Sequence, residues 1–211
     1  MEERLTELGC EEFSERLAAR ESVPGGGGAA ALVGALGAAL CSMAGACTVG
    51  KPRYRDVEED VTEIMEEADA IRYRLIELVE EDASGFESLM EAYALPKDDP
   101  ARPEGLEAAI VSAAMAPLGM VGECCRAVVL LEEMGEKCSR MLVSDVACGA
   151  QLVRAAIEAA SVNVYVNTSS LADRSQARRI ESTCEELVEE YVPRAERLAR
   201  DIVCGIRSRG A

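Results

Sequence analysis

The chain has 211 residues and a formal net charge of −17, and 49% of its residues are hydrophobic although only 3% are aromatic. This length suffices for one domain with a hydrophobic core, so we expect a single domain over residues 1–211. The acidic excess excludes nucleic acid as the expected partner, because a phosphate-binding face has to be basic.

Nine cysteines and the absence of histidine restrict the chemistry. No CxxC pair exists, and Cys124 and Cys125 are adjacent while the others are scattered through Ala-rich stretches. The N-terminus has no hydrophobic leader, so we expect a cytoplasmic protein whose thiols are reduced and mostly buried. No metal is expected, because zinc-ligand spacing is missing, and any catalysis must use side chains other than His.

A short amphipathic helix over residues 9–20 and a glycine loop over residues 21–28 precede an uncharged helix, rich in Ala and Gly, over residues 29–49. This composition suits a helix that is buried on nearly all sides. Glycine inside a helix costs about 1 kcal/mol relative to Ala, so its repeated use predicts close approach between helices. The uncharged run is long enough to cross a membrane, but Ala and Gly contribute little transfer free energy and the flanks carry no aromatic belt. We therefore expect no membrane span.

The rest of the chain also has helical periodicity. Apolar residues recur at every third or fourth position over residues 54–93, and a proline-rich loop follows. Three more helices are expected over residues 104–134, 146–167 and 172–206. Pro117 should kink the first of them or mark a junction between two pieces, and Gly135 separates it from the next segment. The sequence thus predicts an all-α antiparallel bundle of about six helices, with a buried Ala/Gly-rich helix in its centre.

Two of the expected helices also predict self-association. Residues 29–49 and 146–160 are apolar on too many faces for one small bundle to cover alone. A homodimer is therefore expected.

The first candidate site combines the glycines with a basic cluster. Gly25, Gly26, Gly27 and Gly28 precede a helix, whose free N–H groups can bind an anion. The segment 50–55 (GKPRYR) follows the same helix and holds Lys51, Arg53, Tyr54 and Arg55. The alternative is that the glycines only form a turn and the basic side chains only face solvent. The arrangement is not a P-loop, because the lysine lies at the far end of the helix from the glycines.

Two acids and two amides are the other candidates. Asp82 is one turn from Phe86 and could face inward, whereas Asp145 heads an Ala-rich helix and could be its N-cap. Asn163 and Asn167 are four residues apart and so share one helical face. Buried amides need partners, which could be a ligand or simply a neighbouring helix.

Six segments carry a resemblance to a known family. In chain order they are PGGGGAAALVGALGAAL, GKPRY, EDASGF, AYALPK, SDVACGAQL and NVYVN. In this order and spacing they resemble the cyclodeaminase/cyclohydrolase family. That family comprises the C-terminal domain of formiminotransferase-cyclodeaminase and the stand-alone methenyltetrahydrofolate cyclohydrolases. The resemblance covers about residues 5–206.

The resemblance implies an all-helical, dimeric enzyme that acts on a tetrahydrofolate derivative without a metal. Its first implied reaction is that of a cyclodeaminase, which closes 5-formiminotetrahydrofolate to 5,10-methenyltetrahydrofolate with loss of ammonia. The alternative is a cyclohydrolase, which opens the methenyl bridge to 10-formyltetrahydrofolate. A second alternative is a helical binding protein of the same fold without catalysis. A separate formiminotransferase would be a further partner.

The resemblance also implies roles for the candidate residues. Asp145 is the expected acid–base group and Asp82 the second choice, while Lys51, helped by Arg53 or Arg55, would hold the glutamate carboxylates. The remaining implied substrate-binding residues are Gly25, Gly26, Gly27, Gly28, Tyr54, Asn163 and Asn167. The chain departs from the family at three positions: it has Gly28 where Ser or Thr is usual, and Ser139 and Met141 where Asn is usual.

Overall fold

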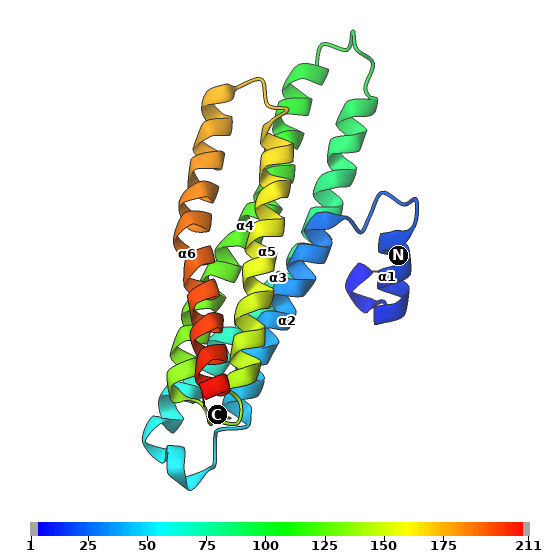
Figure 1. The fold of residues 1–211 in the computed structure, drawn as a ribbon. Coiled ribbons are helices and arrows are strands. Elements are labelled where there is room, and N and C mark those ends of the chain that lie inside the picture. Colours follow the sequence, from blue (N-terminus) through cyan, green and yellow to red (C-terminus); the bar gives the residue numbers. More distant parts are fainter. Residues whose placement is uncertain (1–3, 209–211) are drawn as a thin grey trace.

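The computed structural model describes residues 4–208 and contains six α-helices and two short 3-10 helices, with no strand in that range (Figure 1). The helices are η1 (Leu5–Glu7), α1 (Cys10–Ala18), α2 (Gly26–Ala46), η2 (Pro52–Val57), α3 (Glu58–Ala94), α4 (Arg102–Lys137), α5 (Val143–Thr168) and α6 (Arg174–Ser208). The long helices α3 to α6 run alternately up and down the bundle, and α2 runs in the same direction as α4 and α6. The predicted all-α antiparallel bundle is confirmed.

The long helices form where the apolar periodicity predicts them. In α3 the buried positions include Val61, Ile64, Ala68, Ile71 and Leu75, which recur at every third or fourth residue and face the core. Charged residues cover the opposite face. The hydrophobic stripe of α3 is therefore sufficient to fix its orientation in the bundle.

Helix α2 begins at Gly26, earlier than the predicted start at residue 29. Three of the glycines assigned to a loop are therefore the first turn of the helix, and Gly25 is its N-cap. At the other end, Gly50 has a φ of +77°, a left-handed conformation that suits glycine and stops the chain from continuing as a helix. Pro52 then opens η2, as expected of a proline at a helix start.

The glycines of α2 do allow close packing, as predicted. A Cβ at Gly37 would lie 2.6 Å from Cγ1 of Val153 and 3.0 Å from the carbonyl oxygen of Gly149, both on α5. Helix α2 packs against α3, α4 and α5. Its burial is nevertheless incomplete: Leu36 is 52% exposed, and Met43 is also exposed. The expectation that α2 is buried on nearly all sides is wrong for this outer face, because no helix of the same chain covers it.

Two predicted boundaries on either side of the α4–α5 turn are also wrong. Helix α4 continues through Gly135 to Lys137, and a Cβ at Gly135 would lie at an ordinary contact distance of 3.5 Å from side-chain atoms of Leu198 and Val146. Helix α5 begins at Val143 with Leu142 as its N-cap, so Asp145 is the third residue of the helix and not its N-cap.

The cysteines are all unpaired, and five are buried while four are exposed; the exposed ones are Cys10, Cys47, Cys148 and Cys204. The expectation that the thiols are mostly buried holds for five of the nine. Helices α2 and α4 each contain a stretch that is apolar enough to span a membrane, yet half of each stretch is buried inside the bundle, so this is weak support for a membrane span.

Candidate functional site

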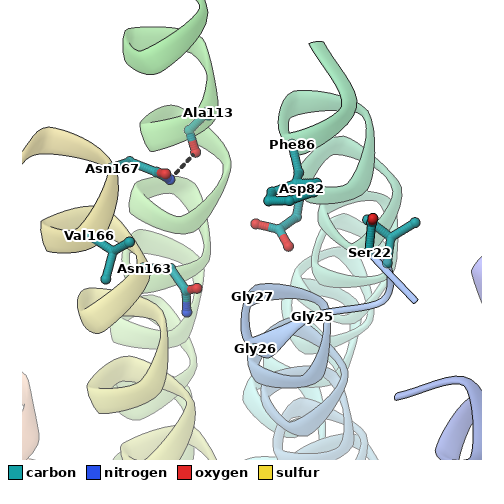
Figure 2. Close-up of a pocket in the computed structure, with 11 residues that line it drawn as sticks. Ser22, Gly25, Gly26, Gly27, Asp82, Phe86, Ala113, Asn163, Val166 and Asn167 are labelled. Carbon is teal, nitrogen blue, oxygen red and sulfur yellow. Dashed lines mark hydrogen bonds between the residues drawn. The ribbon is translucent and has the colours of Figure 1, made fainter. Parts of the chain in front are cut away.

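A cavity of about 190 Å³ opens at the N-terminus of α2 (Figure 2). Helix α2 has 21 residues whereas α3 has 37, so the upper parts of α3 and α5 extend beyond the start of α2 and leave a space between them. The cavity is lined by Ser22, Val23, Gly25, Gly26, Gly27, Asp82, Phe86, Ala113, Asn163, Val166 and Asn167. The structure therefore brings Gly25, Gly26 and Gly27, one of the two candidate acids and both candidate amides together.

Asp82 on α3 points at the first turn of α2. Its carboxylate occupies the space that a Cβ of Gly27 would need, so a side chain at position 27 would displace it. The first turn of a helix has N–H groups without helical partners, and the N-cap, Gly25, has no side chain to accept them. Asp82 therefore places an anion where α2 needs one, from a different helix.

Burial raises the pKa of Asp82 above its ordinary value of 3.8, and the backbone N–H of Gly28 lowers it by a smaller amount. Burial favours the neutral form because the carboxylate loses hydration, whereas the amide favours the charged form. A carboxyl group with a raised pKa exchanges its proton closer to neutral pH, which is what acid–base catalysis requires.

Asn167 is oriented by a defect in α4. Pro117 has no N–H, so the carbonyl of Ala113, four residues earlier, lacks its helical partner. Asn167 Nδ2 donates a hydrogen bond to that carbonyl oxygen at 2.9 Å (Figure 2). This bond fixes the amide and leaves Oδ1 as an acceptor for a ligand.

Asn163 is held in a similar way. Its Nδ2 donates to the carbonyl oxygen of Ala159 at 2.9 Å, and its amide lies beside Gly26. Within residues 4–208, neither Asn163 Oδ1 nor Asn167 Oδ1 accepts a hydrogen bond. The described residues that line the cavity include no Lys or Arg. The cavity therefore presents acceptors and one acid, and it lacks a cation.

Gly28, which replaces the Ser or Thr usual in the family, does not line the cavity. It is buried, and a Cβ at this position would lie 3.6 Å from Cβ of Pro24 and 3.6 Å from Cγ1 of Val79, an ordinary contact distance. A side chain at this position would therefore start among Pro24 and Val79, on the packed side of α2.

The predicted basic residues lie at the other end of α2. Lys51 Nζ contacts Ser139 Oγ at 3.4 Å, and the Arg140 N–H donates to the hydroxyl oxygen of Tyr54 at 3.3 Å. The guanidinium of Arg53 lies 5.9 Å from the centre of the Tyr54 ring. The Arg140 N–H, a hydrogen bond with Ser139 and the neighbouring charges of Arg53 and Lys51 lower the pKa of Tyr54. We call Lys51, Arg53, Tyr54 and Arg140 the basic cluster.

The basic cluster has no internal counter-charge. In the part of the chain that the structure describes, no acidic side chain forms an ion pair with Lys51, Arg53 or Arg140, although many other Arg residues are paired. Ser139, at a position where the family usually has Asn, is buried and accepts from Lys51, whereas Met141 is 82% exposed and contributes no polar group. Unpaired cations in a chain of net charge −17 indicate a site for an anion.

Asp145 lies at the same end as the basic cluster. It is half-buried and close enough to Cys138 for its charge to raise the pKa of that thiol, after the larger effect of burial. The two acids predicted to serve one reaction are therefore separated by most of the length of α2. A 21-residue helix spans about 30 Å.

Two contributors were not predicted from the sequence. Pro117 was interpreted as a kink or as a junction between two helical pieces, although a proline inside a helix also leaves the carbonyl four residues earlier without its helical donor. Arg140 has no sequence signal, because its backbone contact with Tyr54 depends on how the α4–α5 turn folds. Among residues 4–208 there is no group of three Cys, Asp or Glu side chains that could hold a metal ion.

The fold is that of an all-α bundle of long helices, and the acceptor-lined cavity at the N-terminus of α2 is its candidate small-molecule site. Residues 9–186 match the sequence profile of formiminotransferase-cyclodeaminase. The chain is 36% identical to a methenyltetrahydrofolate cyclohydrolase of Methylorubrum extorquens, over 79% of this chain and 82% of that protein. The chain therefore belongs to the formiminotransferase-cyclodeaminase family, as the sequence resemblance indicated.

Two further relatives support the same family assignment. The structure resembles that of a formiminotetrahydrofolate cyclodeaminase from Thermotoga maritima with a TM-score of 0.82 and 28% identity, over 93% of this chain and 98% of that one. The chain is also 28% identical to the mouse formimidoyltransferase-cyclodeaminase, and the match covers 82% of this chain and 32% of the mouse protein. It thus corresponds to about a third of that longer relative.

Proposed function

We propose that this protein is an enzyme of folate one-carbon metabolism that hydrolyses 5,10-methenyltetrahydrofolate to 10-formyltetrahydrofolate. The observation that carries the proposal is the cavity, where Asp82 and two amide oxygens face a space without any cation. The methenyl bridge is a positively charged amidinium, which such acceptors stabilise. The 36% identity to a cyclohydrolase over 82% of its length favours hydrolysis, which reverses the order expected from the sequence alone.

Asp82 would carry the proton. Water adds to the bridging carbon, and one of its protons passes to the Asp82 carboxylate. The tetrahedral intermediate then breaks its bond to N5, which takes that proton, while the carbon stays on N10 as a formyl group and the hydroxyl proton is released. The carboxylate also stabilises the cationic carbon before water attacks, so a partly buried acid suits both steps.

The other residues would bind and orient the folate. Asn163 and Asn167 offer Oδ1 atoms to N–H groups of the pterin, and the first turn of α2, including Gly27, would lie against the bridge. A cavity of about 190 Å³ is smaller than the roughly 300–1,000 Å³ of sites for drug-sized ligands, so it would hold only part of the molecule. Lys51 and Arg53 would bind the glutamate carboxylates.

Cyclodeamination is the second candidate, because the same cavity could serve it. N10 of 5-formiminotetrahydrofolate would attack the formimino carbon, and the proton of N10 would pass to the imino nitrogen. Asp82 in its protonated form would give that nitrogen its second proton, so that the bond to carbon breaks, ammonia leaves and the methenyl cation remains. The likeness to the Thermotoga maritima cyclodeaminase, at a TM-score of 0.82, favours this reaction. Both reactions pass through a tetrahedral carbon between N5 and N10, so one arrangement of groups fits either.

The test offers each folate separately to the purified full chain and follows the absorbance of the methenyl form. If the protein is a hydrolase, the absorbance of 5,10-methenyltetrahydrofolate should fall faster with the wild type than with the Asp82→Asn variant. The rate with the variant also corrects for spontaneous hydrolysis. Deamination predicts a gain of absorbance with 5-formiminotetrahydrofolate. If neither folate reacts faster with the wild type than with the Asp82→Asn variant, the enzyme proposal is wrong. Calorimetric folate binding without turnover would then favour the helical binding protein.

A further inference from the structure

The cavity at the start of α2 has two layers of side chains. Helices α3 and α5 run in the same direction, so a step of four residues along either helix leads about 6 Å away from α2 (Figure 1). Asp82 on α3 and Asn163 on α5 lie beside the first turn of α2. Phe86 and Asn167 line the same cavity, each four residues further along its helix. The lower layer therefore holds the acid, and the upper layer holds an aromatic ring.

The upper layer has an exposed apolar side chain on each of the two helices that flank the cavity. Phe86 on α3 is 38% exposed and Val166 on α5 is 62% exposed, and both line the cavity (Figure 2). Phe86 is the only aromatic residue among the described residues that line it. The other phenylalanine of the chain, Phe13, is buried. Ligand sites are lined mainly by apolar and aromatic groups, so these two walls suit the faces of a flat ring.

The edge of such a ring would meet an acceptor. The bond from Asn167 Nδ2 to the carbonyl oxygen of Ala113 holds the amide against α4, and Asn167 Oδ1 accepts no hydrogen bond within residues 4–208. A ring that fills the upper layer therefore needs apolar faces and an N–H group on its edge. The pterin of a folate has both. The p-aminobenzoyl ring has no N–H group within its ring, so the pterin fits better.

The position of Asp82 requires the same orientation of the substrate. The methenyl bridge is planar and fused to the pterin, and water attacks its carbon from one side of that plane. Asp82 projects into the cavity from α3, so one face of the fused rings has to turn towards α3 (Figure 2). Phe86 is one turn from Asp82 on the same side of α3. Its ring would meet that face of the pterin, beside the reacting carbon.

We propose that Phe86 is the residue on which the pterin ring stacks, with Val166 against the opposite face and Asn167 at the ring edge. The inference rests on the proposed function and names the part of the folate that enters the cavity. A volume of about 190 Å³ admits only part of the molecule, and the stacked part is the fused ring system. Stacking would hold the bridging carbon at the level of Asp82, which makes Phe86 a determinant of specificity for pterins.

Two substitutions of Phe86 test the stacking. Tetrahydrofolate is the probe, because it carries no one-carbon group and cannot react, and calorimetry measures its Kd. Phe86→Leu keeps an apolar side chain but removes the flat ring, so the Kd should rise by about 2- to 12-fold, the usual value of one aromatic pair. Phe86→Tyr keeps the ring and should bind like the wild type. Both variants should keep the melting temperature of the wild type, because the Phe86 side chain is partly exposed. Equal Kd values for the wild type and Phe86→Leu would overturn the inference.

Neighbouring exposed residues supply matched controls. Met90 is 46% exposed one turn further along α3 and does not line the cavity, so Met90→Leu should leave the Kd unchanged. On α5, Val166→Ala should raise the Kd by about 2- to 4-fold, because one lost CH₂ contact is worth up to about fourfold. Val162 is 57% exposed and does not line the cavity, so Val162→Ala should not raise it. Losses in Met90→Leu and Val162→Ala as large as that in Phe86→Leu would overturn the assignment.

Two fragments of the substrate decide which ring lies on Phe86. The first, 6-methyltetrahydropterin, carries the pterin alone, and p-aminobenzoylglutamate carries the rest of the folate. Each fragment competes with tetrahydrofolate for the wild type and for Phe86→Leu. The inhibition constant of the pterin fragment should rise by about 2- to 12-fold in Phe86→Leu, and that of p-aminobenzoylglutamate should not change. The reverse result would put the p-aminobenzoyl ring on Phe86 and overturn the inference.

The outcomes separate this inference from the proposed function. A wild type that binds tetrahydrofolate and the pterin fragment through Phe86, but turns over neither folate, would overturn the proposed enzyme and support the stacking. A wild type that turns over a folate, together with an unchanged Kd in Phe86→Leu, would support the proposed function and overturn the stacking. A wild type that binds no folate would overturn both.

Discussion

Asn167 donates a hydrogen bond from Nδ2 to the carbonyl oxygen of Ala113 at 2.9 Å, across the gap between α5 and α4. Pro117 cannot supply the helical N–H for that carbonyl, so the amide replaces it. A proline in one helix thereby fixes the orientation of a side chain on another, and with it one wall of the cavity.

This relationship predicts that residues 117 and 167 are energetically coupled. Asn167→Ala should lower the free energy of unfolding by about 1–3 kcal/mol, because it leaves a buried carbonyl unsatisfied. In a Pro117→Ala background the new N–H binds Ala113, so the cost should fall below about 1 kcal/mol. Urea unfolding of the four chains measures the coupling. Asn163→Ala is the control and should show no coupling to Pro117→Ala, since its acceptor Ala159 is in an unbroken part of α5. Equal costs of Asn167→Ala in both backgrounds would contradict the assignment.

The contact between Gly27 and Asp82 predicts an unequal response of two adjacent glycines. Gly27→Ala forces the Asp82 carboxylate away from the first turn of α2 and should destabilise the protein by about 1–3 kcal/mol, the usual cost of overpacking. Gly26→Ala, whose Cβ would lie 3.7 Å from the Asn163 amide, should change stability by less than about 1 kcal/mol. Thermal unfolding of both variants measures the two costs. Similar stabilities would show that the Asp82 side chain moves away from a Cβ at position 27 without a cost in stability.

The raised pKa of Asp82 predicts a pH-dependent stability difference. Between 3.8, the ordinary value, and its raised native pKa, the folded protein keeps a proton that the unfolded chain has lost. The contribution of Asp82 to stability is therefore full below pH 3.8 and is lost as the pH rises through the native pKa. Asp82→Asn removes this dependence, so the variant should gain stability relative to the wild type as the pH is raised from about 3.5 to about 7. A difference that stays constant with pH would mean that Asp82 titrates normally.

The two acids predict a ranking of catalytic effects. Asp82→Asn should lower turnover by at least about 100-fold, the low end for loss of acid–base catalysis, because Asp82 is the acid that lines the cavity. Asp145→Asn tests the residue that the sequence ranked first, and it should leave the melting temperature nearly unchanged, because Leu142 rather than Asp145 is the N-cap. Normal turnover in Asp82→Asn together with a 100-fold loss in Asp145→Asn would reverse the two roles.

The basic cluster predicts a defect in binding rather than in chemistry. Lys51→Ala should raise KM more than it lowers kcat, because Lys51 would contact the carboxylates and not the reacting carbon. The effect should shrink at high salt, where charge attraction is screened. Arg197→Ala on the exposed side of α6 removes one positive charge elsewhere and should change neither constant. An equal effect of both variants would show that only net charge matters.

The sequence alone determined the class of the fold and most of the members of the site. Apolar residues at every third or fourth position required helices, because only one face of each can be buried, and the glycines of α2 indicated that its neighbours approach closely. The segments that carry the family resemblance named Asp82, Asn163 and Asn167, and the structure brings these three together around one cavity.

Only the tertiary structure decided how those residues are distributed. The first turn of α2 lies against the carboxylate of Asp82, a residue far away in the sequence, and the local glycine pattern does not contain that contact. The separation of Asp82 from Lys51 depends on the direction and length of α2, which the local pattern near either residue does not contain. The spacing of apolar residues shows which side of a helix is apolar. Whether that side is covered depends on how many helices are available to pack against it. In this bundle the helices of one chain leave the outer side of α2 exposed.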